Sequence, residues 1–281
     1  MKLHEVRALV TGASGGIGAA IAREIVAGGG RVLITGRDVR ALQRLALSLD
    51  PHGDRVVVHV ADIAQARERD ALIAVATARC DGVNVLVNNA GVASFGAFAQ
   101  GPAQDFEHLL AVNVLAPMHL CRALLPHLQR QPAAHIVNVG SVFGAIGYPG
   151  QVAYSTSKFA LRGFSEALRR ELGDSTVNVH YLAPRATRTG FNSAAVDELN
   201  AELAVATDPP ERVAAAVRRM LETGQPEAVI GWPEKLFVRI NSILPRLVDR
   251  SLARQLPVIS QRLAPERAAP VSIDPVSGEV S

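Results

Sequence analysis

The chain has 281 residues, of which 48% are hydrophobic and 20% charged. This composition is typical of a folded globular protein and excludes a disordered or fibrous chain. The formal net charge of +3 is small for this length, so electrostatics give no argument for a nucleic-acid partner.

Short apolar runs rich in β-branched residues recur along the chain, and helix-like segments separate them. Several runs are apolar throughout, as in strands that are covered on both faces. This alternation predicts parallel strands with right-handed crossovers and helices on both faces of the sheet. We therefore predict an α/β fold with a doubly wound parallel sheet of about seven strands. The expected strands are 7–12, 31–36, 55–62, 83–88, 135–141, 177–184 and 228–232, and the clearest helical segments are 17–27, 65–79, 106–129 and 159–172.

A glycine-rich turn connects the first expected strand to the first helix, where residues 11–18 read TGASGGIG. Glycines let the chain turn sharply and let a diphosphate approach the backbone, while the helix N-terminus offers free N–H donors and a positive dipole end. Because the turn lies between a strand and a helix, it favours a Rossmann-type dinucleotide site over a turn without a ligand. The expected cofactor-binding residues in this turn are Gly12, Ser14, Gly16, Ile17 and Gly18.

The end of the second strand indicates which dinucleotide binds. Sites that prefer the unphosphorylated cofactor usually carry an acidic residue there, which binds the ribose 2′-hydroxyl. This chain has Gly36 followed by Arg37, whose guanidinium suits a 2′-phosphate, and Asp38 is placed to cap the next helix. We therefore expect NADP(H) to be favoured over NAD(H).

A tyrosine and a lysine four residues apart, Tyr154 and Lys158, are candidate proton-transfer groups. An i, i+4 pair on a helix projects from one face, so the phenol and the ammonium can share a site. A nearby cation lowers the phenol pKa from its usual value of about 10, which allows proton exchange with an alcohol. The chain has only three lysines against 26 arginines, so a lysine here indicates a task for a compact, rotatable donor.

Two more polar residues, Ser141 and Asn113, fall where the predicted fold brings them near this pair. Ser141 ends an expected strand, and its hydroxyl can orient or stabilise a carbonyl oxygen. Asn113 lies in an apolar helical segment, where its amide either bonds to nearby backbone or holds a water in a proton relay.

Together these features resemble the short-chain dehydrogenase/reductase family over about residues 5–235. The matching positions are the glycine turn, Asp62 after the third strand, the NNAG sequence at 88–91, Asn113, Ser141 and the Tyr-x-x-x-Lys pair. The resemblance implies Tyr154 as general acid/base, and Lys158 as a ribose ligand that also lowers the phenol pKa. It further implies that Ser141 positions the substrate oxygen, that Asn113 supports a relay water, and that the chain forms a homodimer or homotetramer. The further cofactor contacts that it implies come from Asp62, Ile63, Asn89, Ala90, Gly91, Pro184 and Thr189.

The chain departs from the family after the sixth strand. Family members usually have Pro-Gly there, with a threonine four residues after the glycine. Here Pro184 is followed by Arg185, while Thr189 occupies the threonine position and is the candidate ligand of the nicotinamide carboxamide. Two interpretations of Arg185 stay open: its side chain lies in solvent, or it meets an anionic group of the substrate.

The pattern changes near residue 233. Residues 236–256 are apolar, carry arginines at intervals of seven and four, and are divided by Pro245. We divide the chain into a cofactor-binding catalytic domain at 1–235, an amphipathic extension at 236–263 and a loose tail at 264–281. The extension packs over its own domain or a subunit interface, which we favour, or it lies on an anionic membrane surface. Either arrangement provides an apolar lid and favours a hydrophobic substrate such as an acyl chain, steroid or polyketide.

Signals for several other functions are missing from the sequence. The N-terminal residues lack the apolar segment of a signal peptide, and no stretch approaches about 18 uncharged apolar residues, so we expect a cytoplasmic enzyme. The eight histidines and the two cysteines, Cys80 and Cys121, lack metal-ligand spacing, so we expect no metal and two buried thiols. No Gly-x-Ser-x-Gly sequence indicates a serine hydrolase.

The sequence thus predicts an NADP(H)-dependent oxidoreductase that interconverts a carbonyl and an alcohol of a small molecule by hydride transfer. The alternative is a non-catalytic dinucleotide-binding redox sensor, which has no need of the tyrosine. A sugar-nucleotide epimerase of the related extended fold needs a larger C-terminal substrate domain than this chain provides.

Overall fold

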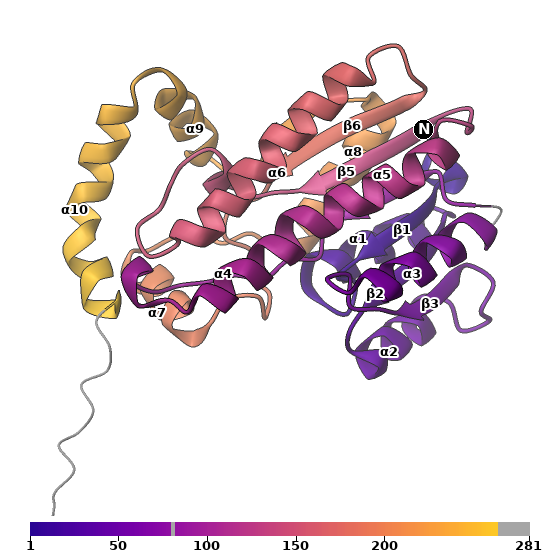
Figure 1. The fold of residues 1–281 in the computed structure, drawn as a ribbon, viewed down its shortest axis with the longest axis horizontal. Coiled ribbons are helices and arrows are strands. Elements are labelled where there is room, and N and C mark those ends of the chain that lie inside the picture. The colour runs from indigo at the N-terminus through magenta and orange to yellow at the C-terminus, as the bar shows by residue number, and fades with distance from the viewer. Residues whose placement is uncertain (80–81, 264–281) are drawn as a thin grey trace, which may run out of the picture.

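Seven strands form one parallel sheet, as the sequence pattern predicts (Figure 1). The computed structural model describes residues 1–79 and 82–263. The strand order β3-β2-β1-β4-β5-β6-β7 reverses direction between β1 and β4, which makes the sheet doubly wound. The strands are β1 (Arg7–Thr11), β2 (Arg31–Gly36), β3 (Val56–Val60), β4 (Val85–Asn88), β5 (Ala134–Val139), β6 (Val177–Ala183) and β7 (Glu227–Val229).

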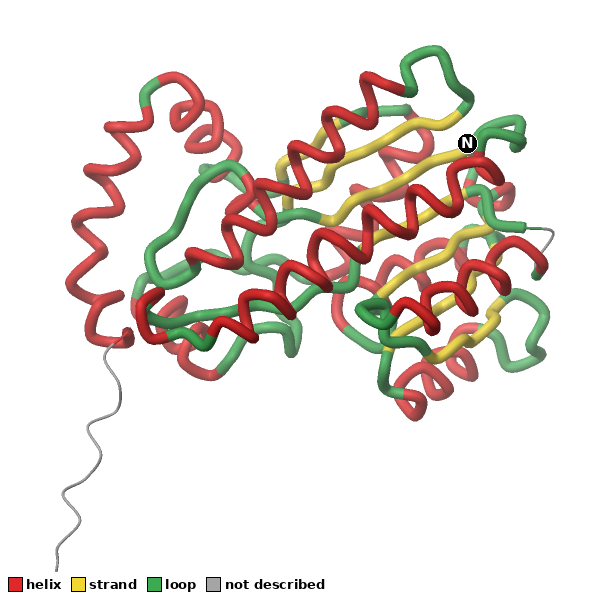
Figure 2. Tube along the Cα trace, viewed as in Figure 1, coloured by secondary structure: helices red, strands yellow, loops and turns green. Residues whose placement is uncertain are grey.

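Helices cover both faces of the sheet, and two more project beyond the main body (Figure 2). One short 3-10 turn, η4 (Val142–Gly144), and one π-helical turn, η3 (Ala111–Leu115), adjoin the site described below. The α-helices of the described chain are α1 (Gly16–Ala27), α2 (Val39–Leu49), α3 (Ala66–Ala78), α4 (Ala103–Leu110), α5 (Ala116–Leu128), α6 (Val152–Glu171), α7 (Ala194–Glu202), α8 (Pro210–Thr223), α9 (Glu234–Ile243) and α10 (Pro245–Leu263).

The sheet separates two hydrophobic cores. Side chains alternate across a strand, so Val10 of β1 faces the core under α1, α2 and α8, while its neighbour Leu9 faces the core under α3, α5 and α6. Strands β4 and β5 are buried along their whole length. Burial on both faces explains why these strands are apolar throughout in the sequence.

Helix boundaries differ from the sequence expectations by more than one residue in two places. The helix that carries Tyr154 begins at Val152 rather than at residue 159. The helical segment expected at 106–129 spans 103–128 and contains the π-helical turn η3 between α4 and α5. A π-turn adds one residue to a helical turn, which hydrophobic periodicity does not reveal.

The run Ala103–Leu128 is long and apolar enough to cross a membrane by length and composition, which the sequence analysis did not expect. Half of its most apolar window is buried inside the protein. Leu120 and Leu124 of this run are fully buried in the core between the sheet and α3, α5 and α6. Packing within the fold therefore accounts for the buried half of this window.

Pro245 divides the C-terminal segment into α9 and α10, as expected. These helices lie at one end of the molecule, against the loops at that end (Figure 1). Asn241 Nδ2 of α9 donates to the carbonyl of Ala145 at 2.8 Å, and the hydroxyl of Tyr148 donates to Gln255 Oε1 of α10 at 3.1 Å. The expected tail at 264–281 and Cys80 lie outside the described residues, while Cys121 is buried.

Candidate active site

The site lies where the strand order reverses, at the carboxyl ends of β1 and β4. The segments after these strands are held together: Asn89 Nδ2 donates to the carbonyl of Thr11 at 2.9 Å, and the Ala90 amide donates to Thr11 Oγ1 at 3.0 Å. Gly12 has φ +65°, and a Cβ there would lie 2.7 Å from Ala90 Cα. A side chain at position 12 would therefore separate the two segments.

A cavity of about 720 Å³ extends from the glycine turn to the Tyr154 side chain. It brings together most of the residues predicted from sequence. Gly18 and Asn113 do not line it, because Gly18 packs against the carbonyl of Gly12 and Asn113 lies behind the Gly91 loop. The predicted residues that do line the cavity are Gly12, Ser14, Gly16, Ile17, Arg37, Asp62, Ile63, Asn89, Ala90, Gly91, Ser141, Tyr154, Lys158, Pro184 and Thr189.

The glycine turn forms an open cradle at the N-terminus of α1. No side chain caps this helix, and no atom lies within 4 Å of the position that a Cβ on Gly15 would take. Gly16 has φ +55°, and a Cβ there would lie 2.9 Å from Thr189 Cγ2, so the turn also contacts the loop after β6. Uncapped N–H groups beside open space fit the diphosphate of a dinucleotide.

The end of β2 is arranged as the sequence predicts. Asp38 Oδ1 accepts from the Ala41 amide at 2.9 Å and caps α2. Arg37 is exposed at the edge of the cavity, next to Gly36. The Asp38 carboxylate thus caps α2, and the Arg37 guanidinium borders the cavity.

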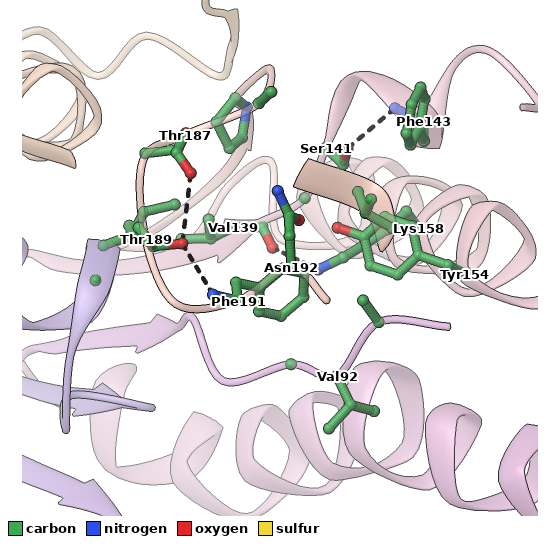
Figure 3. A pocket seen from close by; sticks show the side chains of 18 of the residues that line it. Val92, Val139, Ser141, Phe143, Tyr154, Lys158, Thr187, Thr189, Phe191 and Asn192 are labelled. Atoms are coloured by element: carbon green, nitrogen blue, oxygen red, sulfur yellow. Dashed lines mark hydrogen bonds between the residues drawn. The ribbon is translucent and has the colours of Figure 1, made fainter. Parts of the chain in front are cut away.

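Tyr154 and Lys158 project from the first turns of α6 and are 8% and 4% exposed (Figure 3). Lys158 Nζ donates to the carbonyl of Val139 at 3.1 Å and lies 5.6 Å from the centre of the Tyr154 ring. Burial raises the pKa of Tyr154 to about 12, with the Ser141 hydroxyl acting in the opposite direction, and burial lowers the pKa of Lys158 to about 8. The pKa of Tyr154 is therefore raised by burial, and the lowering by Lys158 that the sequence analysis expects is not found in this structure.

Ser141 caps the turn η4 and lies two residues after the end of β5 at Val139, so it does not end the strand as the sequence analysis expects. Its Oγ accepts from the Phe143 amide at 3.1 Å. Sequence reasoning missed the residue behind it: the hydroxyl of Tyr181 in β6 donates to the carbonyl of Ser141 at 3.2 Å and accepts from its amide at 3.4 Å. A Cβ on Gly140 or Gly144 would overlap the Tyr181 side chain, so both glycines make room for it.

Asn113 lies in the π-helical turn η3, and its side chain is bonded on both sides. Its Oδ1 accepts from the Val92 amide at 2.8 Å, and its Nδ2 donates to the Val92 carbonyl at 2.9 Å and to Ser157 Oγ at 3.0 Å. The amide therefore fixes the loop after β4 to α6, which agrees with the first of the two sequence interpretations.

The comparisons with known proteins agree with this geometry. A family model described as short chain dehydrogenase matches residues 6–200. The chain belongs to the short-chain dehydrogenase family. Nodulation protein G of Rhizobium sp. (strain N33) is 40% identical over 215 residues, which cover 75% of this chain and 84% of that protein.

Solved structures of short-chain dehydrogenases have the same fold. One from Burkholderia phymatum in complex with NAD aligns with a TM-score of 0.81 at 25% identity, over 88% of this chain and 96% of that chain. One from Sphingobium yanoikuyae in complex with NADPH aligns with a TM-score of 0.74 at 26% identity, over 94% and 98% of the two chains. The protein is thus an NAD(P)-dependent dehydrogenase or reductase.

Arg185 of this short-chain dehydrogenase lines the cavity but does not lie in solvent, the first of the two interpretations given above. Its side chain is only 11% exposed, and it is paired with Asp208 at 2.9 Å and with Glu234 at 3.3 Å. The hydrogen bonds that Arg185 donates to the Asp208 carboxylate raise the pKa of Arg185. The guanidinium therefore joins parts of the protein to each other and does not extend into solvent.

The end of the cavity beyond Tyr154 is lined by aromatic and aliphatic side chains that the sequence analysis did not identify as site residues. Phe143 meets the Tyr154 ring edge-on at 6.5 Å between centroids, and Phe191 lies tilted against it at 6.1 Å (Figure 3). Because these residues come from separate segments of the chain, no local pattern reveals that they converge. The apolar lining also includes Val196, Leu199, Phe237, Val248 and Leu252.

Proposed function

We propose that the protein is an NADP(H)-dependent oxidoreductase that interconverts a carbonyl and an alcohol by hydride transfer, with Tyr154 as general acid/base. One observation carries the proposal. The Tyr154 phenol and the Lys158 ammonium are buried together in a cavity that continues to the uncapped N-terminus of α1. A redox sensor that only binds the dinucleotide has no use for this buried pair.

During reduction, the Tyr154 hydroxyl gives its proton to the oxygen of the carbonyl substrate as that oxygen becomes negative. The Ser141 hydroxyl donates a hydrogen bond to the same oxygen and orients it. The nicotinamide supplies the hydride when the cofactor is bound, and the ammonium of Lys158 binds its ribose. In the oxidation of an alcohol, the proton returns to the Tyr154 oxygen.

The pKa values favour reduction near neutral pH. With its pKa raised to about 12, Tyr154 holds its proton there and is ready to donate it. Lys158, with its pKa lowered to about 8, keeps its positive charge at neutral pH and loses it in mildly alkaline solution. Oxidation, which needs the phenolate, is expected to require higher pH.

The preference for NADP(H) rests on Arg37. Its position after β2 at the edge of the cavity suits a 2′-phosphate, and Asp38 is engaged as the cap of α2. The solved relatives include complexes with NADPH and with NAD, so the proposed preference depends on Arg37 and not on the comparisons.

The substrate is proposed to be a hydrophobic small molecule. Phe143, Phe191, Phe237, Val248 and Leu252 line the cavity around and beyond Tyr154. Since α9 and α10 contribute three of these residues, the extension at 236–263 is proposed to act as an apolar wall of a catalytic domain that comprises residues 1–235.

A second copy of the chain is the proposed partner, in a cytoplasmic homodimer or homotetramer. Apolar side chains are exposed along the outer faces of η3, α5 and α6, where Leu115 and Met118 are 50% and 40% exposed and Phe159 is 44% exposed. An apolar strip of this kind is suited to burial against the same strip of another subunit.

The test is a screen for NADPH oxidation across ketones, 3-oxoacyl thioesters and quinones, with Tyr154→Phe as the comparison. We expect Tyr154→Phe to lower kcat by about 100- to 10,000-fold on every active substrate, because the general acid is lost. Isothermal titration calorimetry should show that the variant still binds NADPH. Equal rates for variant and parent would refute the proposal.

A further inference from the structure

The helices α9 and α10 form a C-terminal hairpin, residues 234–263, that has one occupied face and one open face (Figure 1). The occupied face contains the buried side chains Val238, Val248 and Ile259 and the cavity-lining Phe237 and Leu252. The hairpin is also fixed at the far end of α10, where Arg262 is paired with Glu198 and Glu202 of α7. The turn between α9 and α10 lies at the opposite end of α10.

This turn presents a group of large apolar side chains to the surroundings. Ile243, Leu244 and Leu247 are 77%, 54% and 49% exposed and lie within five consecutive residues. Single exposed leucines are common on protein surfaces, but a contiguous apolar tip is not. We call these three residues the hairpin tip.

Exposed basic side chains lie along both helices that lead to the hairpin tip. Lys235, Arg239 and Ile243 are exposed and follow each other at intervals of four residues, which places them on one face of α9. Residues 235–256 contain five basic side chains and one acidic side chain, Asp249, for a net charge of +4, compared with +3 for the whole chain. All five are exposed; they are Lys235, Arg239, Arg246, Arg250 and Arg254.

We propose that the hairpin tip docks on the surface of an anionic lipid bilayer. Ile243, Leu244 and Leu247 enter the boundary between headgroups and acyl chains, and the surrounding arginines contact the lipid phosphates. An apolar tip with a basic border matches the two forces that hold proteins on such surfaces, burial of apolar area and attraction to anionic lipid.

A second copy of the chain fits this surface less well. In a twofold contact the same patch meets itself, so the five basic side chains of one subunit would face those of the other. Like charges brought together in this way oppose association. An anionic bilayer offers negative charge to the arginines and an apolar layer to the hairpin tip. It therefore complements both the charged and the apolar parts of this surface.

Vesicle flotation of the full chain tests the proposal. We expect the protein to float with vesicles that contain phosphatidylcholine and phosphatidylglycerol, and not with vesicles of phosphatidylcholine alone. Added salt should release it, because screening weakens the attraction between the arginines and the headgroups. Failure to float with the anionic vesicles overturns the proposal.

Double variants test whether the hairpin tip and its neighbouring arginines form the surface that binds the vesicles. Arg239→Gln/Arg250→Gln should lower the vesicle partition coefficient by more than about tenfold, since each basic residue near an anionic surface contributes severalfold. Ile243→Ser/Leu247→Ser should lower it as well by removing the tip. The matched control Arg44→Gln/Arg219→Gln removes two exposed cations from α2 and α8 and should bind like the parent.

Two results contradict the proposal even if the parent floats. One is an equal loss of binding in the control and in Arg239→Gln/Arg250→Gln, which would indicate attraction by the whole chain. The other is a dimer in size-exclusion chromatography that Ile243→Ser/Leu247→Ser dissociates, which would assign the tip to a second copy. All substituted side chains are exposed, so thermal melts should match that of the parent.

Discussion

Arg185 and Asp208 face each other through two hydrogen bonds of 2.9 Å, from Nε to Oδ2 and from Nη2 to Oδ1. Asp208 is 2% exposed, and its backbone amide donates to the carbonyl of Ala186 at 2.9 Å. The pair thus fixes the loop after β6, which carries Thr189, to the segment before α8. Arg185 also contacts Glu234, the first residue of α9, and so connects this loop to the C-terminal hairpin.

Arg185→Ala should lower the free energy of unfolding by about 2–4 kcal/mol, because it leaves the buried Asp208 carboxylate without its bidentate partner. Urea unfolding of the single and double variants with Asp208→Ala measures the coupling, which should exceed about 1 kcal/mol. Arg212 is the matched control: it contacts Asp208 at 2.8 Å, but its side chain is 55% exposed. Its coupling with Asp208 should stay below about 1 kcal/mol because solvent screens it.

The same substitution separates a structural role from substrate binding. A connecting role predicts that Arg185→Ala lowers kcat/KM for anionic and neutral substrates alike, since the loop that carries Thr189 loses its support. A selective loss for anionic substrates would show that the guanidinium contacts the substrate instead.

Features that depend on local patterns could be predicted from the sequence. Strands buried on both faces are apolar throughout, a glycine turn between strand and helix needs positive φ at Gly12 and Gly16, and Asp38 is a good helix cap. Tyr154 and Lys158 are four residues apart, so helix geometry alone brings them together.

Features that depend on contacts between distant segments could not be predicted. Arg185 and Asp208 are 23 residues apart in the chain and Arg185 and Glu234 are 49 apart, with no periodicity that links them. The π-turn at Asn113 interrupts a helix whose hydrophobic pattern is continuous. The helix α7, by contrast, has local signals, because Ser193 caps a segment rich in Ala, Leu and Glu.

Arg37→Ala should change cofactor preference. Loss of a charge-assisted contact with a 2′-phosphate costs about 1.5–3 kcal/mol, so the ratio of kcat/KM for NADPH to that for NADH should fall by about 10- to 100-fold. Steady-state kinetics with both cofactors measures this ratio. Arg44→Ala, which removes an exposed arginine farther along α2, should leave it unchanged, and an unchanged ratio in Arg37→Ala would refute the assignment.

Tyr181→Phe should lower both stability and turnover, because Tyr181 supports the backbone on both sides of Ser141. Removing the hydroxyl leaves a buried amide and a buried carbonyl without this partner, which costs about 1–3 kcal/mol in the free energy of unfolding. If the hydroxyl also positions Ser141, kcat should fall while the Kd for NADPH stays the same. A stability loss with unchanged kcat would limit Tyr181 to a packing role.

Two buried histidines should make stability depend on pH. His135 Nδ1 lies 2.8 Å from His180 Nε2, and His180 Nδ1 lies 2.7 Å from the carbonyl of Gln225. A donor on His180 Nδ1 leaves its Nε2 to accept from His135, so both rings are neutral. Burial lowers the pKa of His135 to about 3, with His180 contributing, and burial also lowers the pKa of His180.

The direction of this pH dependence follows from proton binding in the folded and unfolded chains. The unfolded chain binds protons at both imidazoles below about pH 6.5 and the folded chain binds them less readily, so stability is full above this pH and is lost as the pH falls. From about pH 7 to about pH 5 the two rings together should lower the free energy of unfolding by up to about 4 kcal/mol. Urea unfolding at several pH values across this range measures the free energy of unfolding. His135→Gln/His180→Gln should flatten the dependence and exposed His52→Gln should not; the same slope in the double variant would place the titrating groups elsewhere.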